Sequence, residues 1–411
     1  MATDWKRTLY LLAFVQLVSA IGFSSIFPFL PLYIETLGSG TGLSIETLAG
    51  LIYSVPAITM MVAAPIWGAL ADRHGRKPMV VRATVGAAII TALMAFAQSA
   101  EQLVAIRAVQ GMVSGVVSAN TALVAAIVPR ERAGYALGLL QVGHWSGLSI
   151  GPLIGGVTAD VLGFRAAFMF TALLLGIAGL LAWRMVHEDF TPMPTPAGRR
   201  VGFFGAWRHV ISMPGVLPTY LARFLNELAR NLVMPFLALF VATLMTRESG
   251  TASVTGVTTA LAALSGTVAA IYLGRLGDRV GHKRVLLASA AGAAVFYLPQ
   301  GMVSRVWQLI VLQALTGFAA GGVMPTLSAL LATYTDPGEE GAVYGLEASI
   351  MSAARAIAPM VGAALAGAFG MRSLFTGTGL IFIVLAITAA RLLPARRVVT
   401  ASPPSETVIA R

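Results

Sequence analysis

Charged residues are scarce in this sequence, and cysteine is absent. Only 11% of the 411 residues are Asp, Glu, Lys or Arg, against about a quarter in soluble proteins, and 57% are hydrophobic. A soluble chain could not hide so much apolar surface, and a mean hydropathy of +0.81 indicates lipid as the solvent. This composition excludes a soluble enzyme and a disordered scaffold. The absence of cysteine excludes disulfides, thiol catalysis and cysteine-based metal sites. Because the five scattered histidines also lack metal-ligand spacing, we expect no cofactor.

Apolar runs of about 20 residues, the length that crosses a bilayer, recur along the whole chain. We predict an all-α integral membrane protein with twelve transmembrane helices, near residues 8–37, 47–70, 79–98, 102–127, 135–161, 166–186, 214–245, 251–273, 285–303, 306–333, 343–369 and 373–393. The first run is too long for a cleavable signal peptide, so we expect it to remain as the first helix.

The basic residues are unevenly distributed between the two sides of these helices. If both termini are cytoplasmic, most of the 28 Lys and Arg residues fall in cytoplasmic segments. Only Arg165, Arg247, Arg305 and Arg372 fall in the opposite segments. This bias follows the positive-inside rule and predicts cytoplasmic N- and C-termini. The net charge of +11 therefore reflects topology, and we expect no nucleic-acid partner.

The chain repeats itself at an offset of about half its length. Residues 68–81 read GALADRHGRKPMVV and residues 274–287 read GRLGDRVGHKRVLL, and three further segment pairs keep the same offset within one residue. We therefore predict two pseudo-symmetric six-helix bundles, over residues 1–186 and 214–393. Between them, residues 187–213 are expected to form a cytoplasmic linker, either a plain tether or a tether with a short interfacial helix around Phe203, Phe204 and Trp207. Residues 394–411 are expected to form a cytoplasmic tail.

Two further patterns have direct physical meaning. The loop after the second predicted helix combines turn-forming glycines with charges, at Gly68, Asp72, Arg73, Gly75, Arg76 and Lys77, and its repeat keeps Asp278 and Gly281. Glycine at position 75 lets the chain reverse tightly between two helices. The fifth predicted helix carries a stripe of small residues that permits close approach of another helix, at Gly143, Gly147, Gly151, Pro152, Gly155 and Gly156. In the first helix, Pro28 and Pro31 predict a bend.

With these motifs, the sequence resembles the twelve-helix drug:proton antiporters of the major facilitator superfamily over residues 8–393. The resemblance implies that the loop at residues 68–77 is a cytoplasmic latch and that the stripe of the fifth helix seals and pivots against the other half. It also implies a bacterial cytoplasmic membrane. One departure concerns the latch: Ala126 stands where relatives often carry an acidic residue, so Glu131 is a substitute partner for Arg76.

A few charges remain inside the predicted membrane segments, where they are expensive and usually serve a function. The resemblance links Arg107 of the fourth helix to proton coupling; a structural pairing with backbone carbonyls is the alternative. In the seventh helix a polar stripe is predicted to line the central cavity, formed by Tyr220, Arg223, Asn226, Glu227, Arg230 and Asn231. We expect Glu227 to be the one acidic residue deep in the membrane, because Glu35, Asp160 and Glu347 lie nearer to helix ends.

Glu227 has two interpretations. It is either the carboxylate that binds and releases the transported proton, or a structural charge clamped by Arg223 and Arg230. Arg355 of the eleventh helix is a further partner that could compete for Glu227 between states. His144, within the glycine stripe, either titrates near neutral pH or packs as a neutral ring.

These features predict a monomeric exporter of small lipophilic molecules, driven by proton entry and not an enzyme. Its expected partners are its substrate, protons and membrane lipids. Two alternatives stay open: an importer or metabolite exporter of the same superfamily, and a membrane sensor that does not transport. A nucleotide-binding loop of the type G-x4-G-K-[ST] is absent, which disfavours ATP-driven pumping.

Overall fold

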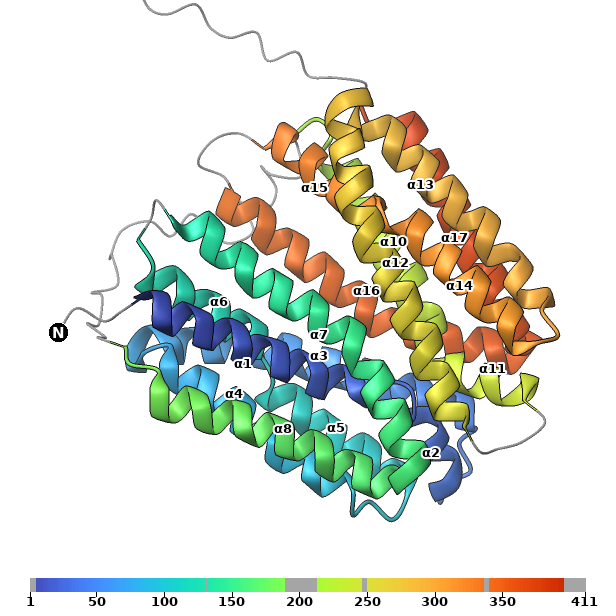
Figure 1. The fold of residues 1–411 in the computed structure, drawn as a ribbon. Coiled ribbons are helices and arrows are strands. Elements are labelled where there is room, and N and C mark those ends of the chain that lie inside the picture. Colours follow the sequence, from blue (N-terminus) through green and yellow to red (C-terminus); the bar gives the residue numbers. More distant parts are fainter. Residues whose placement is uncertain (1–4, 130–131, 189–212, 246–249, 336–339, 395–411) are drawn as a thin grey trace, which may run out of the picture.

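The computed structural model describes residues 5–129, 132–188, 213–245, 250–335 and 340–394, and these residues are almost entirely helical (Figure 1). The first half contains α1 (Trp5–Ser25), α2 (Leu30–Leu37), α3 (Ile45–His74), α4 (Lys77–Met94), α5 (Ala100–Val113), α6 (Val116–Ile127), α7 (Ala133–Leu162) and α8 (Phe164–Met185). The second half contains α10 (Val216–Val233), η2 (Met234–Phe236), α11 (Leu237–Leu244), α12 (Thr251–Val280), α13 (His282–Tyr297), η3 (Leu298–Met302), α14 (Val306–Gly321), α15 (Val323–Tyr334), α16 (Glu340–Phe369) and α17 (Arg372–Leu392).

These elements form the predicted twelve spans. Eleven described segments are long and apolar enough to cross a membrane. The twelfth span is α7, which is 30 residues long. Its many glycines, together with Gln141 and His144, lower its hydropathy below that of the other spans. The predicted all-α membrane fold is confirmed.

Several spans are interrupted where the sequence contains proline or glycine. The first span breaks between Ser25 and Leu30, and Pro31 lies in the first turn of α2, so the predicted bend is confirmed. The fourth span, predicted as one continuous helix, breaks between α5 and α6. Gly115 adopts φ +124° there, a conformation that residues with a Cβ rarely adopt.

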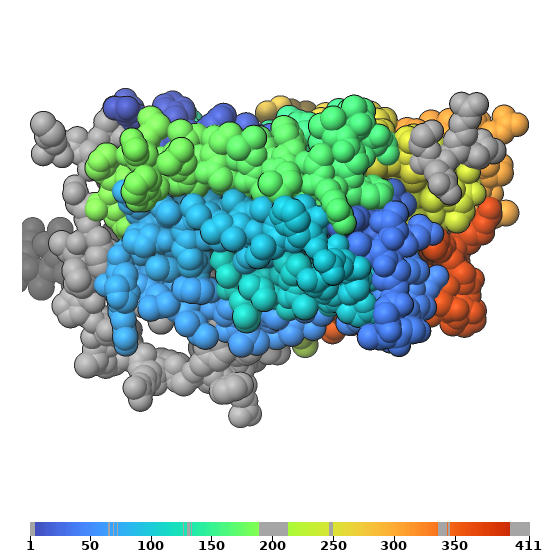
Figure 2. All heavy atoms as spheres, turned by 90° about the horizontal axis from the view of Figure 1, so that it is seen from below, coloured from blue at the N-terminus to red at the C-terminus, as the bar shows by residue number. Residues whose placement is uncertain are grey.

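Helices α1–α8 pack as one bundle and α10–α17 as a second, and the two meet along α7 with α12 and along α3 with α16 (Figure 1). Seen from below, the first bundle covers most of the visible face, and the second emerges at one end of it (Figure 2). At the crossings the backbones approach closely. A methyl group added at Gly156 would overlap the carbonyl of Ala252, and one added at Gly50 would lie 2.9 Å from the carbonyl oxygen of Pro359.

Both close crossings lie toward the same end of the molecule, which we call the closed end. It holds the C-terminus of α7 and the N-termini of α3 and α12, opposite to the end where α1 begins and α17 finishes. The hydrophobic core that joins the halves includes Phe29 and Phe236. A separate core around Leu9 and Leu123, at the terminal end, contains first-half residues alone within the described chain. The two bundles are therefore joined at the closed end and diverge toward the terminal end.

Candidate functional site

The polar stripe predicted in the seventh span lies on α10. Tyr220, Arg223, Asn226 and Glu227 are all buried, although four polar side chains in one apolar helix are costly to bury. The Tyr220 hydroxyl donates a hydrogen bond to the carbonyl of Val343 on α16, 2.8 Å away. The stripe is thus turned toward α16, across the interior of the second bundle.

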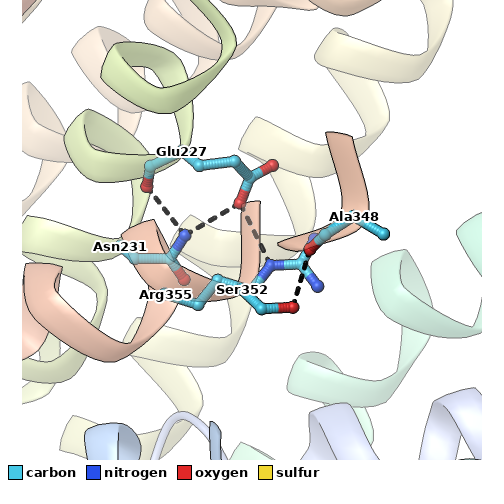
Figure 3. Close-up of polar contacts among 5 residues, drawn as sticks. All are labelled: Glu227, Asn231, Ala348, Ser352 and Arg355. Carbon is cyan, nitrogen blue, oxygen red and sulfur yellow. Dashed lines mark hydrogen bonds and ion pairs between the residues drawn. The ribbon is translucent and has the colours of Figure 1, made fainter. Parts of the chain in front are cut away.

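Glu227 forms an ion pair with Arg355 of α16, with 3.2 Å between Arg355 Nε and Glu227 Oε2 (Figure 3). The Asn231 side-chain amide also donates to Glu227 Oε2, at 3.1 Å, and to the Glu227 backbone carbonyl, at 2.8 Å. The Glu227 side chain is only 7% exposed, whereas that of Arg355 is 53% exposed. The carboxylate is therefore held inside the bundle, while its guanidinium partner extends into accessible space.

Arg223 pairs with Glu347 instead of Glu227, and Arg223 Nη2 also donates to the Ser328 hydroxyl of α15 at 2.8 Å. This corrects two expectations. Glu347, seven residues after the first residue of α16, is buried and is a second acidic group of the site. Helical spacing placed Arg223 and Arg230 near Glu227, but neither is its ion-pair partner in the described structure, because α16 presents a carboxylate to Arg223 and a guanidinium to Glu227.

Arg107 is buried in α5, and its partners are neutral. Its Nε donates to the carbonyl of Ile52 on α3, at 3.2 Å, and its Nη1 donates to the side-chain oxygen of Gln110. The Gln110 amide continues the chain of hydrogen bonds to Thr91 on α4, at 3.1 Å. The contact with Ile52 agrees with the carbonyl-pairing alternative; proton coupling by Arg107 stays a prediction.

The first bundle contains a hydrogen-bond network of two amides and a histidine that was not predicted from the sequence. The Gln16 side chain on α1 accepts from Asn120 of α6 at 2.8 Å and lies 3.3 Å from His144 Nδ1 on α7. Gln16 precedes Arg223 by 207 residues, which agrees within one residue with the offset between residues 68–81 and 274–287. The same helix position thus holds a neutral network in one bundle and an ion pair in the other. The sequence signal that could have predicted this network is the presence of the amide side chains Gln16 and Asn120 within apolar helices.

The loop predicted as a latch reverses the chain as expected, with Gly75 at φ +94°. The carboxylate of Glu188 accepts hydrogen bonds from the backbone N–H groups of Arg76, at 2.8 Å, and Lys77, at 2.6 Å. The N-terminus of α4 thus has an anionic partner that was not expected. Glu131, proposed as the partner of Arg76, and the side chain of Asp72 lie outside the described residues. In the repeat, Asp278 lies 3.3 Å from the His282 ring, and Gly281 has φ +99°.

The glycine stripe of α7 has two faces. A methyl group at Gly143, Gly147, Gly151 or Gly155 would overlap atoms of α1, within the same bundle. Only Gly156 and Pro152 face the other half: Gly156 contacts α12 at Ala252, and the Pro152 carbonyl lies against Gly256. The expectation that the whole stripe seals against the other half is therefore wrong, because four-residue spacing turns most of its glycines toward α1.

Asp160 adds a polar contact between the halves at the closed end. Its two carboxylate oxygens accept hydrogen bonds from the backbone N–H groups of Ala252, at 3.3 Å, and Ser253, at 2.6 Å, at the start of α12. A carboxylate at a helix N-terminus is electrostatically favourable. This contact joins α7 to α12 beside the Gly156 crossing.

Comparison with known proteins gives consistent similarities. The family model described as Major Facilitator Superfamily matches residues 12–225 and 219–409. The chain is 34% identical to "Multidrug resistance protein MdtG" of Serratia proteamaculans, over 93% of each chain. It is 32% identical to "Multi-drug resistance efflux pump PmrA homolog" of Lactococcus lactis, also over 93% of each chain. Among solved structures, a bacterial homologue of the human lysosomal transporter Spinster, in an inward-facing and unoccupied conformation, has a TM-score of 0.77 at 15% identity, covering 96% of this chain and 98% of that chain.

Proposed function

The chain belongs to the major facilitator superfamily, as a multi-pass membrane protein, and on that premise we propose that it exports small lipophilic compounds in exchange for protons. The names of its relatives, multidrug resistance protein and multi-drug resistance efflux pump, support drug efflux as the direction and substrate type. The protein acts as a transporter and not as an enzyme. It is a monomer in the bacterial cytoplasmic membrane, in contact with lipid, with both termini cytoplasmic.

The observation that carries this proposal is the buried ion pair between Glu227 and Arg355. A charged carboxylate inside the membrane costs a few kcal/mol. Such groups are therefore rare, are usually paired, and commonly mark proton or substrate pathways. Binding of a proton neutralises Glu227 and releases Arg355, and loss of the proton restores the pair. Because Arg355 is half exposed and Glu227 is buried, the exposed guanidinium gives solvent access to one side of the pair while the carboxylate stays inside the bundle.

The two ends of the molecule supply the alternating access that exchange requires. The closed end is sealed by the crossing of α7 with α12, the crossing of α3 with α16 and the Asp160 contact. The bundles diverge at the terminal end, which is the cytoplasmic end in the proposed orientation. This arrangement supports loading of substrate from the cytoplasm, the step that begins an export cycle. Residues 68–77, held by Glu188, are the proposed latch of the opposite state.

Everted membrane vesicles test the proposal directly. Proton movement caused by added compounds, drawn from a panel of lipophilic dyes and antibiotics, is measured for the wild type, Glu227→Gln and Glu35→Gln. We expect Glu227→Gln to abolish compound-dependent proton movement while the amount of protein in the membrane stays unchanged. Glu35 is exposed at the end of α2, so its substitution is a matched control and should preserve transport.

Normal proton movement in Glu227→Gln would refute the assigned role of this carboxylate. If the wild type moves no protons with any compound of the panel, the transport proposal fails and a sensor function is favoured.

A further inference from the structure

The middle of the membrane region carries more positive than negative charge. Its arginines are Arg107, Arg223, Arg230 and Arg355, and its acidic residues are Glu227 and Glu347. The two carboxylates are each paired, with Arg355 and Arg223. Arg107 is satisfied by neutral groups. Arg230 differs from all of these, because no described residue lies within ion-pair or hydrogen-bond distance of its guanidinium.

The backbone of α10 determines where Arg230 points. Arg230 follows Arg223 by seven residues, close to two helical turns, so the two side chains leave the helix in nearly the same direction. Arg223 contacts α15 and α16. The exposed apolar residue Leu221 precedes Arg230 by nine residues, or two and a half turns, and therefore points to the opposite side. Arg230 thus faces the interior of the second bundle, and Leu221 faces away from it.

Arg230 is nevertheless exposed. It lies near the middle of the apolar segment Val216–Leu244, far from both ends of that segment. An exposed arginine at that depth must face water or a ligand, because contact of its charge with hydrocarbon is strongly unfavourable. One turn earlier on the same face, Asn226 is fully buried, and neither its amide nitrogen nor its oxygen has a hydrogen-bond partner among the described residues. Within the described structure, an exposed cation without an ion-pair partner and a buried amide without a hydrogen-bond partner therefore lie one turn apart on the same face of α10.

We infer that Arg230 is the binding point for an anionic group of the substrate, so that the preferred substrates combine a lipophilic body with a carboxylate, sulfonate or phosphonate group. The inference rests on the proposed export function and narrows its substrate class. The guanidinium binds such oxygen anions through charge-assisted hydrogen bonds. An anion at this position also offsets the surplus of positive charge in the middle of the membrane.

The direction of proton coupling favours Arg230 over Arg355 as the site that binds the substrate anion. If the substrate anion took Arg355, Glu227 would lose its cation and would gain a proton while substrate was bound. Substrate and proton would then travel together, which is cotransport. Arg230 has no carboxylate partner in the described structure, so it binds an anion without breaking the pair of Glu227 with Arg355. This arrangement is compatible with exchange.

A matched pair of compounds tests the site. Sodium 4-biphenylsulfonate and 4-biphenylsulfonamide share one apolar body and differ in charge, and the sulfonate does not carry protons across the membrane by itself. Binding is measured by calorimetric titration of the full-length protein in lipid nanodiscs. We expect the wild type to bind the sulfonate about tenfold more tightly than the sulfonamide, as a charge-assisted hydrogen bond provides.

Three variants make the test specific. Arg230→Gln should lose the preference for the sulfonate and keep its affinity for the sulfonamide, Arg230→Lys should retain most of the preference, and Arg391→Gln, exposed in the last turn of α17, should behave as the wild type. Equal binding of the two compounds by the wild type, or an unchanged preference in Arg230→Gln, would overturn the inference.

Proton movement in everted vesicles separates this inference from the proposed function. Movement with the sulfonamide, together with no preference for the sulfonate, leaves export standing and refutes the anion site. A sulfonate preference that depends on Arg230, without proton movement for any compound, supports the site and refutes proton-coupled export.

Discussion

The buried pair of Arg223 and Glu347 provides a quantitative prediction. The two side chains are 2% and 11% exposed, so neither charge is solvated by bulk water. Replacing Arg223 with glutamine leaves the Glu347 carboxylate buried without its cation. Removal of one member of a buried pair costs about 3–5 kcal/mol, because the remaining charge is uncompensated. At about 2 °C per kcal/mol, the melting temperature of Arg223→Gln should fall by about 6–10 °C.

The double variant Arg223→Gln/Glu347→Gln separates the charge from the packing. It buries two neutral amides in place of two charges, so we expect it to recover at least half of the stability that Arg223→Gln loses. The assay is thermal unfolding of purified protein followed by intrinsic fluorescence, with Arg391→Gln as the control for loss of one positive charge. A wild-type unfolding temperature for Arg223→Gln, or a double variant that is no more stable than Arg223→Gln, would contradict a destabilising unpaired charge at Glu347.

Two further predictions concern the close contacts of α7. Gly155→Ala places a methyl group against the Ser25 carbonyl and should destabilise the protein by about 1–3 kcal/mol in the same thermal assay. Gly138→Ala meets no neighbour and should leave the stability unchanged. Equal effects of the two substitutions would contradict the packing. Asp160→Asn weakens the anionic cap of α12. With Ala252→Cys introduced as the one cysteine of the chain, maleimide should label this cysteine about fivefold faster in Asp160→Asn than with Asp160 intact. An unchanged labelling rate would show that the cap does not hold the closed end.

The two bundles use equivalent positions for different chemistry. The repeat offset relates Gln16 to Arg223, yet Gln16 joins a network with Asn120 and His144, whereas Arg223 joins an ion pair with Glu347. The network of Gln16, Asn120 and His144 contains no carboxylate and no guanidinium, and it joins α1, α6 and α7 to one another. Ion pairs respond to protons and to charged ligands. Both the Arg223–Glu347 pair and the Glu227–Arg355 pair lie in the second bundle.

The sequence by itself determined the features that depend on local composition and spacing. Apolar runs of membrane length predicted the twelve spans, because each span must satisfy its own backbone in lipid. Prolines predicted the break between Ser25 and Leu30, and helical spacing predicted the polar stripe of α10. Each of these depends on residues that are neighbours in the chain or within a few helical turns.

The tertiary structure alone decided which groups meet. Helical spacing placed two arginines beside Glu227, but the register of α10 against α16 gave Glu227 to Arg355 and Glu347 to Arg223. Packing likewise turned most of the glycine stripe of α7 toward α1 and brought Glu188 to the start of α4. The physical reason is that a helix fixes the direction in which a side chain leaves it, whereas the partner depends on the depth and rotation of a neighbouring helix that is distant in the sequence.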